Sequence, residues 1–141
     1  MSLQARLIDA KMLYANGRYE GALLMVLVTI AATARKRYPK EKWSDNKSFR
    51  KFFKEELSKR LPFKSLSILC DGKQEFIEDL FYTYMRCNLV HEAELAPQIK
   101  FEPGEAITMG GGDQFVFTHG WLDLLASIVE QAPENANEFS I

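Results

Sequence analysis

The chain contains few of the residues that build disulfide frameworks or metal centres. Its 141 residues include two cysteines and two histidines. Cys70, Cys87, His91 and His119 do not fall at the spacings of a zinc site. The sequence therefore predicts a protein of a reducing compartment, without a disulfide framework, a metal ion or a cofactor.

Long apolar runs are also missing. The longest uncharged stretch extends for 14 residues, from Gly21 to Ala34, whereas a membrane-spanning helix needs about 20 apolar residues. The first residues, MSLQAR, lack the basic and then apolar layout of a secretion signal. The sequence predicts a soluble, cytoplasmic protein that does not associate with membranes.

The chain as a whole has no excess of one charge, but its parts do. Lys and Arg number 18 and Asp and Glu number 19, for a formal net charge of −1. Residues 35–64 hold 12 of the basic and 4 of the acidic residues, so this segment carries +8 and the remainder −9. Such a segment can attract a nucleic acid, an acidic partner or the acidic part of a second copy.

The chain does have the composition of a globular protein. Apolar residues make up 47% and charged residues 26% of it, and 141 residues suit one domain. The helix over 18–38 is apolar on nearly all sides, so we expect it to be central and buried. Apolar residues at spacings of three and four predict helices over 3–15, 18–38, 46–60, 73–94 and 119–132.

Three short β-type stretches precede the last helix, at 99–101, 106–109 and 115–117. Pro103-Gly104 between the first two is typical of a turn. We interpret Gly110-Gly111-Gly112 as a flexible turn, because no Lys-Ser/Thr follows as in a phosphate-binding loop.

These elements predict an all-α fold. We expect an up-and-down bundle of about five helices, with a small β-hairpin or meander inserted before the C-terminal helix. Residues 1–133 would form a single domain, and residues 134–141 a flexible C-terminal tail.

The run from Tyr84 to Glu92 carries the most suggestive chemistry. Arg86 has a permanently charged guanidinium suited to a phosphate, and His91 can exchange a proton near neutral pH. RNA cleavage by the neighbouring 2′-hydroxyl needs such a cation and such a base, and it needs no metal. On one regular helix, however, the two side chains would point about 140° apart. Alternatively, His91 is a core or interface residue and Arg86 pairs with Asp79 or Glu78.

The run YMRCNLVHE over residues 84–92 resembles the signature of the HEPN superfamily, as does GRYEGALL over residues 17–24. Its members are small all-α bundles, and in many of them the Arg-x4-His motif forms a metal-independent ribonuclease site shared across a dimer. The likeness covers residues 3–130 in layout. It implies that Arg86 and His91 are the catalytic pair and Asn88 a supporting donor. Many active members place Asn, Asp or His after the arginine, where this chain has Cys87.

The basic segment supplies candidate RNA-binding residues. Arg50, Lys51 and Lys54 lie on the predicted helix 46–60, and aromatic residues are interleaved with its charges. Alternatively, Phe49, Phe52 and Phe53 belong to the core and the lysines are merely solvated.

Two further candidates have simpler interpretations. Cys87 and His91 lie four residues apart and could form a nucleophile–base pair, but a small buried cysteine is commoner. His119 is more simply a residue at a helix boundary than part of a site.

The leading hypothesis is a dimeric, HEPN-like, metal-independent endoribonuclease, with a toxin or defence role implied by the resemblance alone. The alternative is a catalytically inactive module of the same fold that dimerises or binds RNA or a partner. A third hypothesis is a helical protein that pairs with an antitoxin or a nucleotidyltransferase-type partner.

Overall fold

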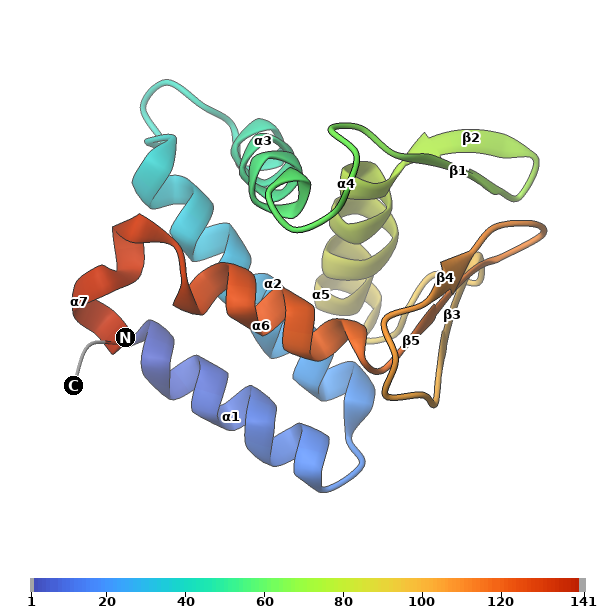
Figure 1. Ribbon diagram of the computed structural model, residues 1–141, viewed down its shortest axis with the longest axis horizontal. Helices are drawn as coiled ribbons and strands as arrows, with labels where there is room; N and C mark the ends of the chain where they lie inside the picture. The colour runs from blue at the N-terminus through green and yellow to red at the C-terminus, as the bar shows by residue number, and fades with distance from the viewer. Residues whose placement is uncertain (1, 140–141) are drawn as a thin grey trace.

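The computed structural model describes residues 2–139 and has a mixed α/β fold (Figure 1). The predicted all-α bundle is wrong, because two β-sheets with five strands between them lie at one end of the helices. The major helices are α1 (Leu3–Ala15), α2 (Tyr19–Arg37), α3 (Asp45–Ser58) and α6 (Trp121–Glu130). A further helix covers residues 77–92. Within residues 2–139, no helix has both the length and the apolar character needed to cross a bilayer.

Helix α2 is the central element, as its all-round apolar sequence predicts. It contacts α1, α3 and α6, and Leu23, Leu27 and Ile30 on it are fully buried. Asn16 ends α1, and Gly17 at φ +72° occupies the left-handed conformation that favours glycine after a helix. Phe49, Phe52 and Phe53 of α3 are also buried, which confirms the core interpretation of these aromatic residues.

The helix predicted over 73–94 begins later than expected because a β-hairpin precedes it. Strands β1 (Ser67–Cys70) and β2 (Lys73–Phe76) pair antiparallel, with Cys70 opposite Lys73. Asp71 and Gly72 form the two-residue loop, both with positive φ. Asp-Gly is a strong signal for this hairpin turn, because both positions need a positive φ. The helix predicted over 73–94 would start directly after this dipeptide.

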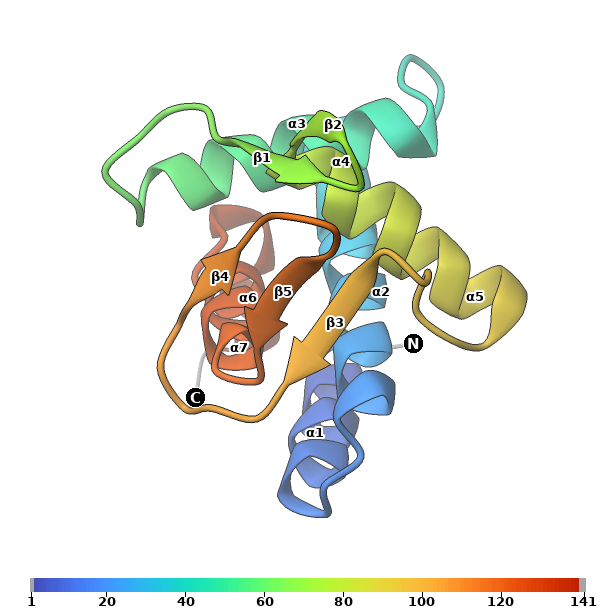
Figure 2. The same cartoon turned by 90° about the vertical axis from the view of Figure 1, so that its right-hand side faces the viewer.

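The predicted hairpin or meander before the last helix is a three-stranded sheet with a different topology. Its strands are β3 (Ile99–Glu102), β4 (Met109–Gly110) and β5 (Phe115–Thr118), in the order β3-β5-β4. Strand β5 pairs parallel with β3 and antiparallel with β4. Burial explains why β5 is central, since Phe115 and Phe117 are fully buried. Figure 2 shows this sheet beside the β1–β2 hairpin.

The segment expected to be a flexible tail is helical as far as Phe139. A 3₁₀ turn (Pro133–Asn135) leads into α7 (Ala136–Phe139). Asn135 is fully buried and donates to the Thr33 hydroxyl and the Val129 carbonyl, each at 2.9 Å. These bonds tie the segment to α2 and α6. Residues 140 and 141 lie outside the described residues.

Candidate functional site

The predicted catalytic run lies on a helix with an unusual middle. The helix comprises α4 (Ile77–Asp79), the π-helical segment η1 (Leu80–Cys87) and α5 (Asn88–Glu92). A π-helix closes i→i+5 hydrogen bonds and is rare; where it occurs, it often marks a functional site. Leu80, Phe81 and Met85 on η1 are fully buried, so the segment is held by the core.

Arg86 lies on the side of this helix that faces α3. Its guanidinium carbon is 5.5 Å from the centroid of the Tyr82 ring, and that ring is 5.2 Å from the ring of Phe49. The buried Arg86 Nε has no hydrogen-bond partner among residues 2–139. The alternative ion pair with Asp79 or Glu78 is wrong for the described residues: Asp79 instead accepts from Arg50 at 3.0 Å.

His91 is exposed near the end of α5, so the interpretation as a core histidine is wrong. No hydrogen bond, ion pair or ring contact joins His91 to Arg86 or to Cys87 in the part of the chain that the structure describes. Asn88 donates to the Glu94 carbonyl at 3.0 Å and thereby closes the turn after the helix. Within the described residues of a single chain, Arg86 contacts Tyr82, Asn88 contacts Glu94 and His91 has no side-chain partner, so the catalytic roles stay a prediction.

The remaining candidates have structural contacts. Burial, followed by the charge and hydrogen bonding of Cys87, raises the pKa of Tyr82. His119 is nearly buried, and its ring stacks on Tyr19 with centroids 3.7 Å apart. Burial lowers the pKa of His119, so a neutral packed ring is favoured at pH 7.

The residues just after the motif helix lie beside the start of α2. The backbone N–H of Leu95, just after the motif helix, donates to Glu20 near the start of α2 at 3.4 Å. Gly17–Gly21 and Ala93-Glu94 line an open depression of about 410 Å³ there. Arg18 lies in this depression, and no ion pair engages it within residues 2–139.

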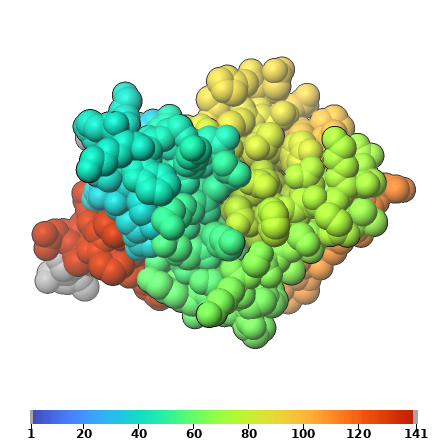
Figure 3. Space-filling view, turned by 90° about the horizontal axis from the view of Figure 1, so that it is seen from above, coloured from blue at the N-terminus to red at the C-terminus, as the bar shows by residue number. Residues whose placement is uncertain are grey.

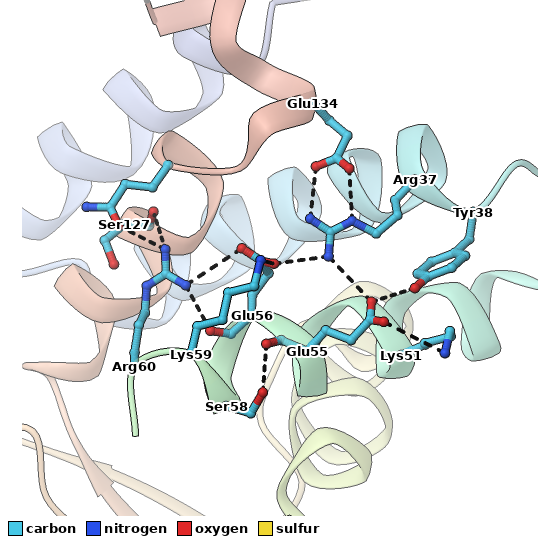
Figure 4. A network of polar contacts seen from close by, with 11 residues as sticks. Arg37, Tyr38, Lys51, Glu55, Glu56, Ser58, Lys59, Arg60, Ser127 and Glu134 are labelled. Carbon is cyan, nitrogen blue, oxygen red and sulfur yellow. Dashed lines mark hydrogen bonds and ion pairs between the residues drawn. The ribbon is translucent and has the colours of Figure 1, made fainter. Parts of the chain in front are cut away.

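Many charges of the basic segment are used to hold the fold together (Figure 4). Arg37 donates to Glu134 at 2.9 and 3.0 Å and to Glu56 at 3.0 Å. Lys59 and Arg60 also pair with Glu56, whose side chain is almost completely buried. Burial together with a hydrogen bond to Glu55 raises the pKa of Tyr38 to about 12. These basic residues bind the protein's own carboxylates.

Five lysines of the same segment do not bind a carboxylate of the protein within residues 2–139. Seven of its 12 basic residues form ion pairs among the described residues. The other five are lysines without an ion pair in residues 2–139: Lys40, Lys42, Lys47, Lys54 and Lys64. They leave a positive surface on and around α3 that the fold does not neutralise.

A depression that we call the basic groove brings the predicted RNA-binding residues together. It has a volume of about 330 Å³ and runs between α3 and the start of the motif helix. Figure 3 looks onto this face, where α3 (teal) adjoins α4 and the hairpin (yellow-green). Its lining comprises Trp43, Lys47, Arg50, Lys51, Lys54, Phe76, Glu78 and Asp79.

The groove combines cations with aromatic surface. Lys47 and Lys54 have no ion pair within residues 2–139, and the Phe76 side chain is 49% exposed. Lys51 lies 5.5 Å from the Tyr38 ring centroid and 6.0 Å from that of Trp43. The three residues that we predicted, Arg50, Lys51 and Lys54, thus share one surface.

The sequence did not predict that Glu78 and Asp79 line the groove. Glu78 is buried, and its Oε1 has no hydrogen-bond partner in the described chain. Burial raises the pKa of Glu78, although the nearby Lys54 opposes this. A glutamate at the start of an apolar helix is an ordinary pattern, so only the packing of α4 against α3 reveals its place in the groove.

Comparison with known proteins identifies a family and adds no activity. Searches of curated proteins and of solved structures each found no match. The family model described as Rv1289 matches residues 2–141, which is nearly the whole chain. The chain therefore belongs to the Rv1289 family.

Proposed function

We propose that this protein binds single-stranded RNA in the basic groove. The supporting observation is that four cations of α3 and two aromatic side chains line one depression. Proteins that bind single strands combine a positive groove for the backbone with aromatic faces on which bases stack. The groove has both, and two of its lysines, Lys47 and Lys54, have no competing ion pair within residues 2–139.

The charge balance also supports binding of a polyanion at this face. Lys47, Arg50, Lys51 and Lys54 oppose Glu78 and Asp79 in the groove lining. Lys40 and Lys42 in the preceding loop and Lys64 after α3 add further positive charge. Each phosphate that a lysine neutralises releases counterions, so affinity should fall steeply as salt rises.

A charge-reversal experiment tests this proposal. Lys47→Glu with Lys54→Glu should weaken binding of a labelled single-stranded RNA at least about tenfold and flatten its salt dependence, measured by fluorescence anisotropy. Lys73→Glu is the control for the single variants Lys47→Glu and Lys54→Glu, because Lys73 is an exposed lysine on β2 without an ion pair in the described chain. Equal loss in both proteins, or no salt-sensitive binding by the wild type, would contradict the proposal.

A second candidate function is the metal-independent endoribonuclease that the HEPN resemblance implies. The exposed imidazole of His91, with no side-chain partner within residues 2–139, favours it. Because one chain does not bring Arg86 and His91 together, cleavage would require two copies to complete a shared site. Asn88 gives one N–H to the Glu94 carbonyl, so its second N–H would be the supporting donor.

This second candidate is tested with RNA in EDTA. The wild type should cleave RNA at a rate that rises with dimer concentration, and His91→Ala should lose cleavage while keeping RNA affinity. Equal cleavage by both proteins, or none by either, would remove the enzymatic function. Homodimerisation, an antitoxin or nucleotidyltransferase-type partner, and a cytoplasmic location stay predictions from the sequence.

A further inference from the structure

A narrow pocket of about 80 Å³ lies between α1 and α6, above the central helix α2. Both outer helices pack on α2, and Figure 1 shows them side by side with α2 behind. The floor of the pocket is Ala22 and Val26 of α2, which are 1% and 2% exposed. Lys11 and Asp123 line the same pocket and are exposed. The pocket therefore leads from the surface down to α2.

Small side chains leave this space open. Ala10 of α1, Ala22 of α2 and Ala126 of α6 all line the pocket, so each of the three helices contributes a methyl group where a larger side chain would fill the gap. A buried water molecule needs two to four polar partners, and these alanine side chains offer none. An apolar group that displaces water from here is therefore favoured by the hydrophobic effect.

The polar side chains of the pocket are Lys11, Tyr14 and Asp123. Lys11 is already neutralised, because its ammonium group pairs with Glu130 at 3.0 Å. Within residues 2–139, no hydrogen bond or ion pair engages the Asp123 carboxylate or the Tyr14 hydroxyl. Burial, followed by the charge of Asp123, raises the pKa of Tyr14. The phenol is thus neutral at pH 7, and the charge left without a partner at this pocket is negative.

We propose that the pocket binds a short aliphatic primary amine, with its carbon chain among the three alanines and its ammonium group at the Asp123 carboxylate. An ammonium group has three donors, so it can bond to Asp123 and to the Tyr14 hydroxyl oxygen together. A carboxylate ligand would instead meet the charge of Asp123, while Lys11 is occupied by Glu130. This inference goes beyond RNA binding, because the pocket and the basic groove share no residue.

The volume of the pocket limits the size of the ligand. A cavity of about 150 Å³ in a protein core holds one benzene molecule. The pocket between α1 and α6 has about half that volume, so a chain of about four carbons fits better than a ring. Butylamine is therefore a suitable probe. Butan-1-ol and butyrate vary its head group, and benzylamine varies its body.

The decisive experiment is a methyl NMR titration of the whole chain, with labelled and assigned alanine methyl groups, at pH 7. Butylamine should shift the signals of Ala10, Ala22 and Ala126. Those of Ala15 and Ala136, which are exposed elsewhere on the molecule, should stay in place. Butylamine should bind about threefold more tightly than butan-1-ol, the effect of one exposed ion pair. Butyrate and benzylamine should bind more weakly than butylamine.

Variants then assign the preference to its residues. Asp123→Asn should make the affinities for butylamine and butan-1-ol equal. Asp113→Asn removes the same charge at an exposed loop position without an ion pair in the described chain, and it should leave the preference intact. Ala126→Leu should fill the pocket and abolish the shifts at Ala10 and Ala22. A melting curve checks that each variant folds.

The outcomes test the pocket and its selectivity in turn. If none of the four probes shifts the pocket alanines, or if the exposed alanines shift equally, the pocket is overturned as a binding site. Equal wild-type affinity for butylamine and butan-1-ol, or a preference that survives Asp123→Asn, overturns the ammonium site. The comparison of probes needs only the wild type, so it decides the question even where Ala126→Leu fails to fold.

Discussion

Arg37 shows at the scale of one residue why a basic segment is not a basic surface. Its guanidinium joins Glu56 of α3 to Glu134 near the C-terminus and lies 4.6 Å from the Phe52 ring centroid. The hydrogen bonds that Arg37 donates to Glu134 raise the pKa of Arg37, so its charge is permanent. The exposed Arg35, by contrast, pairs with a similarly exposed Asp45.

We predict that Arg37→Ala is much more destabilising than Arg35→Ala. Loss of Arg37 leaves the buried Glu56 with fewer partners and releases Glu134, which should lower the free energy of unfolding by about 3 kcal/mol. The exposed Arg35 pair should contribute less than about 1 kcal/mol. Urea denaturation of the two variants measures the difference, and equal losses would contradict this account of the network.

At the scale of elements, the glycine run 110–112 joins the two sheets. Gly112 bridges to Cys70, its N–H donates to the Leu69 carbonyl at 2.9 Å, and its carbonyl accepts from Asp71 at 3.1 Å. A Cβ on Gly111 would lie 2.4 Å from the Leu69 carbonyl oxygen. The sequence interpretation as a flexible turn missed this close approach, which depends on a hairpin about 40 residues earlier in the chain.

Gly111→Ala should therefore push the β1–β2 hairpin away from the larger sheet. We expect a loss of about 2 kcal/mol of unfolding free energy and faster hydrogen exchange at the Gly112 amide. Gly110→Ala is the control, since a Cβ there meets nothing within 4 Å; it should change stability by less than about 0.5 kcal/mol. Similar effects of the two substitutions would contradict the close packing of Gly111 against the β1–β2 hairpin.

At the scale of the whole molecule, carboxylates couple stability to pH in opposite directions. Hydrogen bonds from Arg37 lower the pKa of Glu134. Burial alone would raise the pKa of Glu56, but hydrogen bonds from Lys59 and Arg37 outweigh it and lower that pKa too. Glu78 has a pKa raised by burial, so its ionised form costs stability at neutral pH and protonation relieves that cost.

Glu134 and Glu56, whose pKa values are lowered, predict a loss of stability at acid pH. The stabilisation by Glu134 is fully present above its unfolded pKa of about 4.3 and is lost as pH falls through the lower folded value. Glu134→Gln should be less stable at pH 7 and lose less on acidification, as denaturant titrations at several pH values would measure. Glu41→Gln, at an exposed loop position, should follow the wild-type pH dependence; an unchanged acid limb in Glu134→Gln would exclude this linkage.

Local sequence patterns determined the positions of most helices of this protein. The helices at 3–15, 18–38 and 46–60 follow from apolar spacing, because a helix buries one face through residues near in sequence. The burial of α2 follows from its lack of a polar face. The Asp71-Gly72 hairpin signal was present as well, but the apolar residues after it favoured a longer helix.

Tertiary structure decided what depends on partners distant in sequence. The parallel pairing of β3 with β5 requires a crossover that no short window contains. Arg37 is neutralised by a carboxylate about 100 residues away, whereas Lys47 and Lys54 have no ion pair within residues 2–139. The basic groove and the unpartnered oxygen of Glu78 arise only where α3 meets the start of the motif helix. Sequence supplied the charges, and packing decided which of them remain available to a ligand.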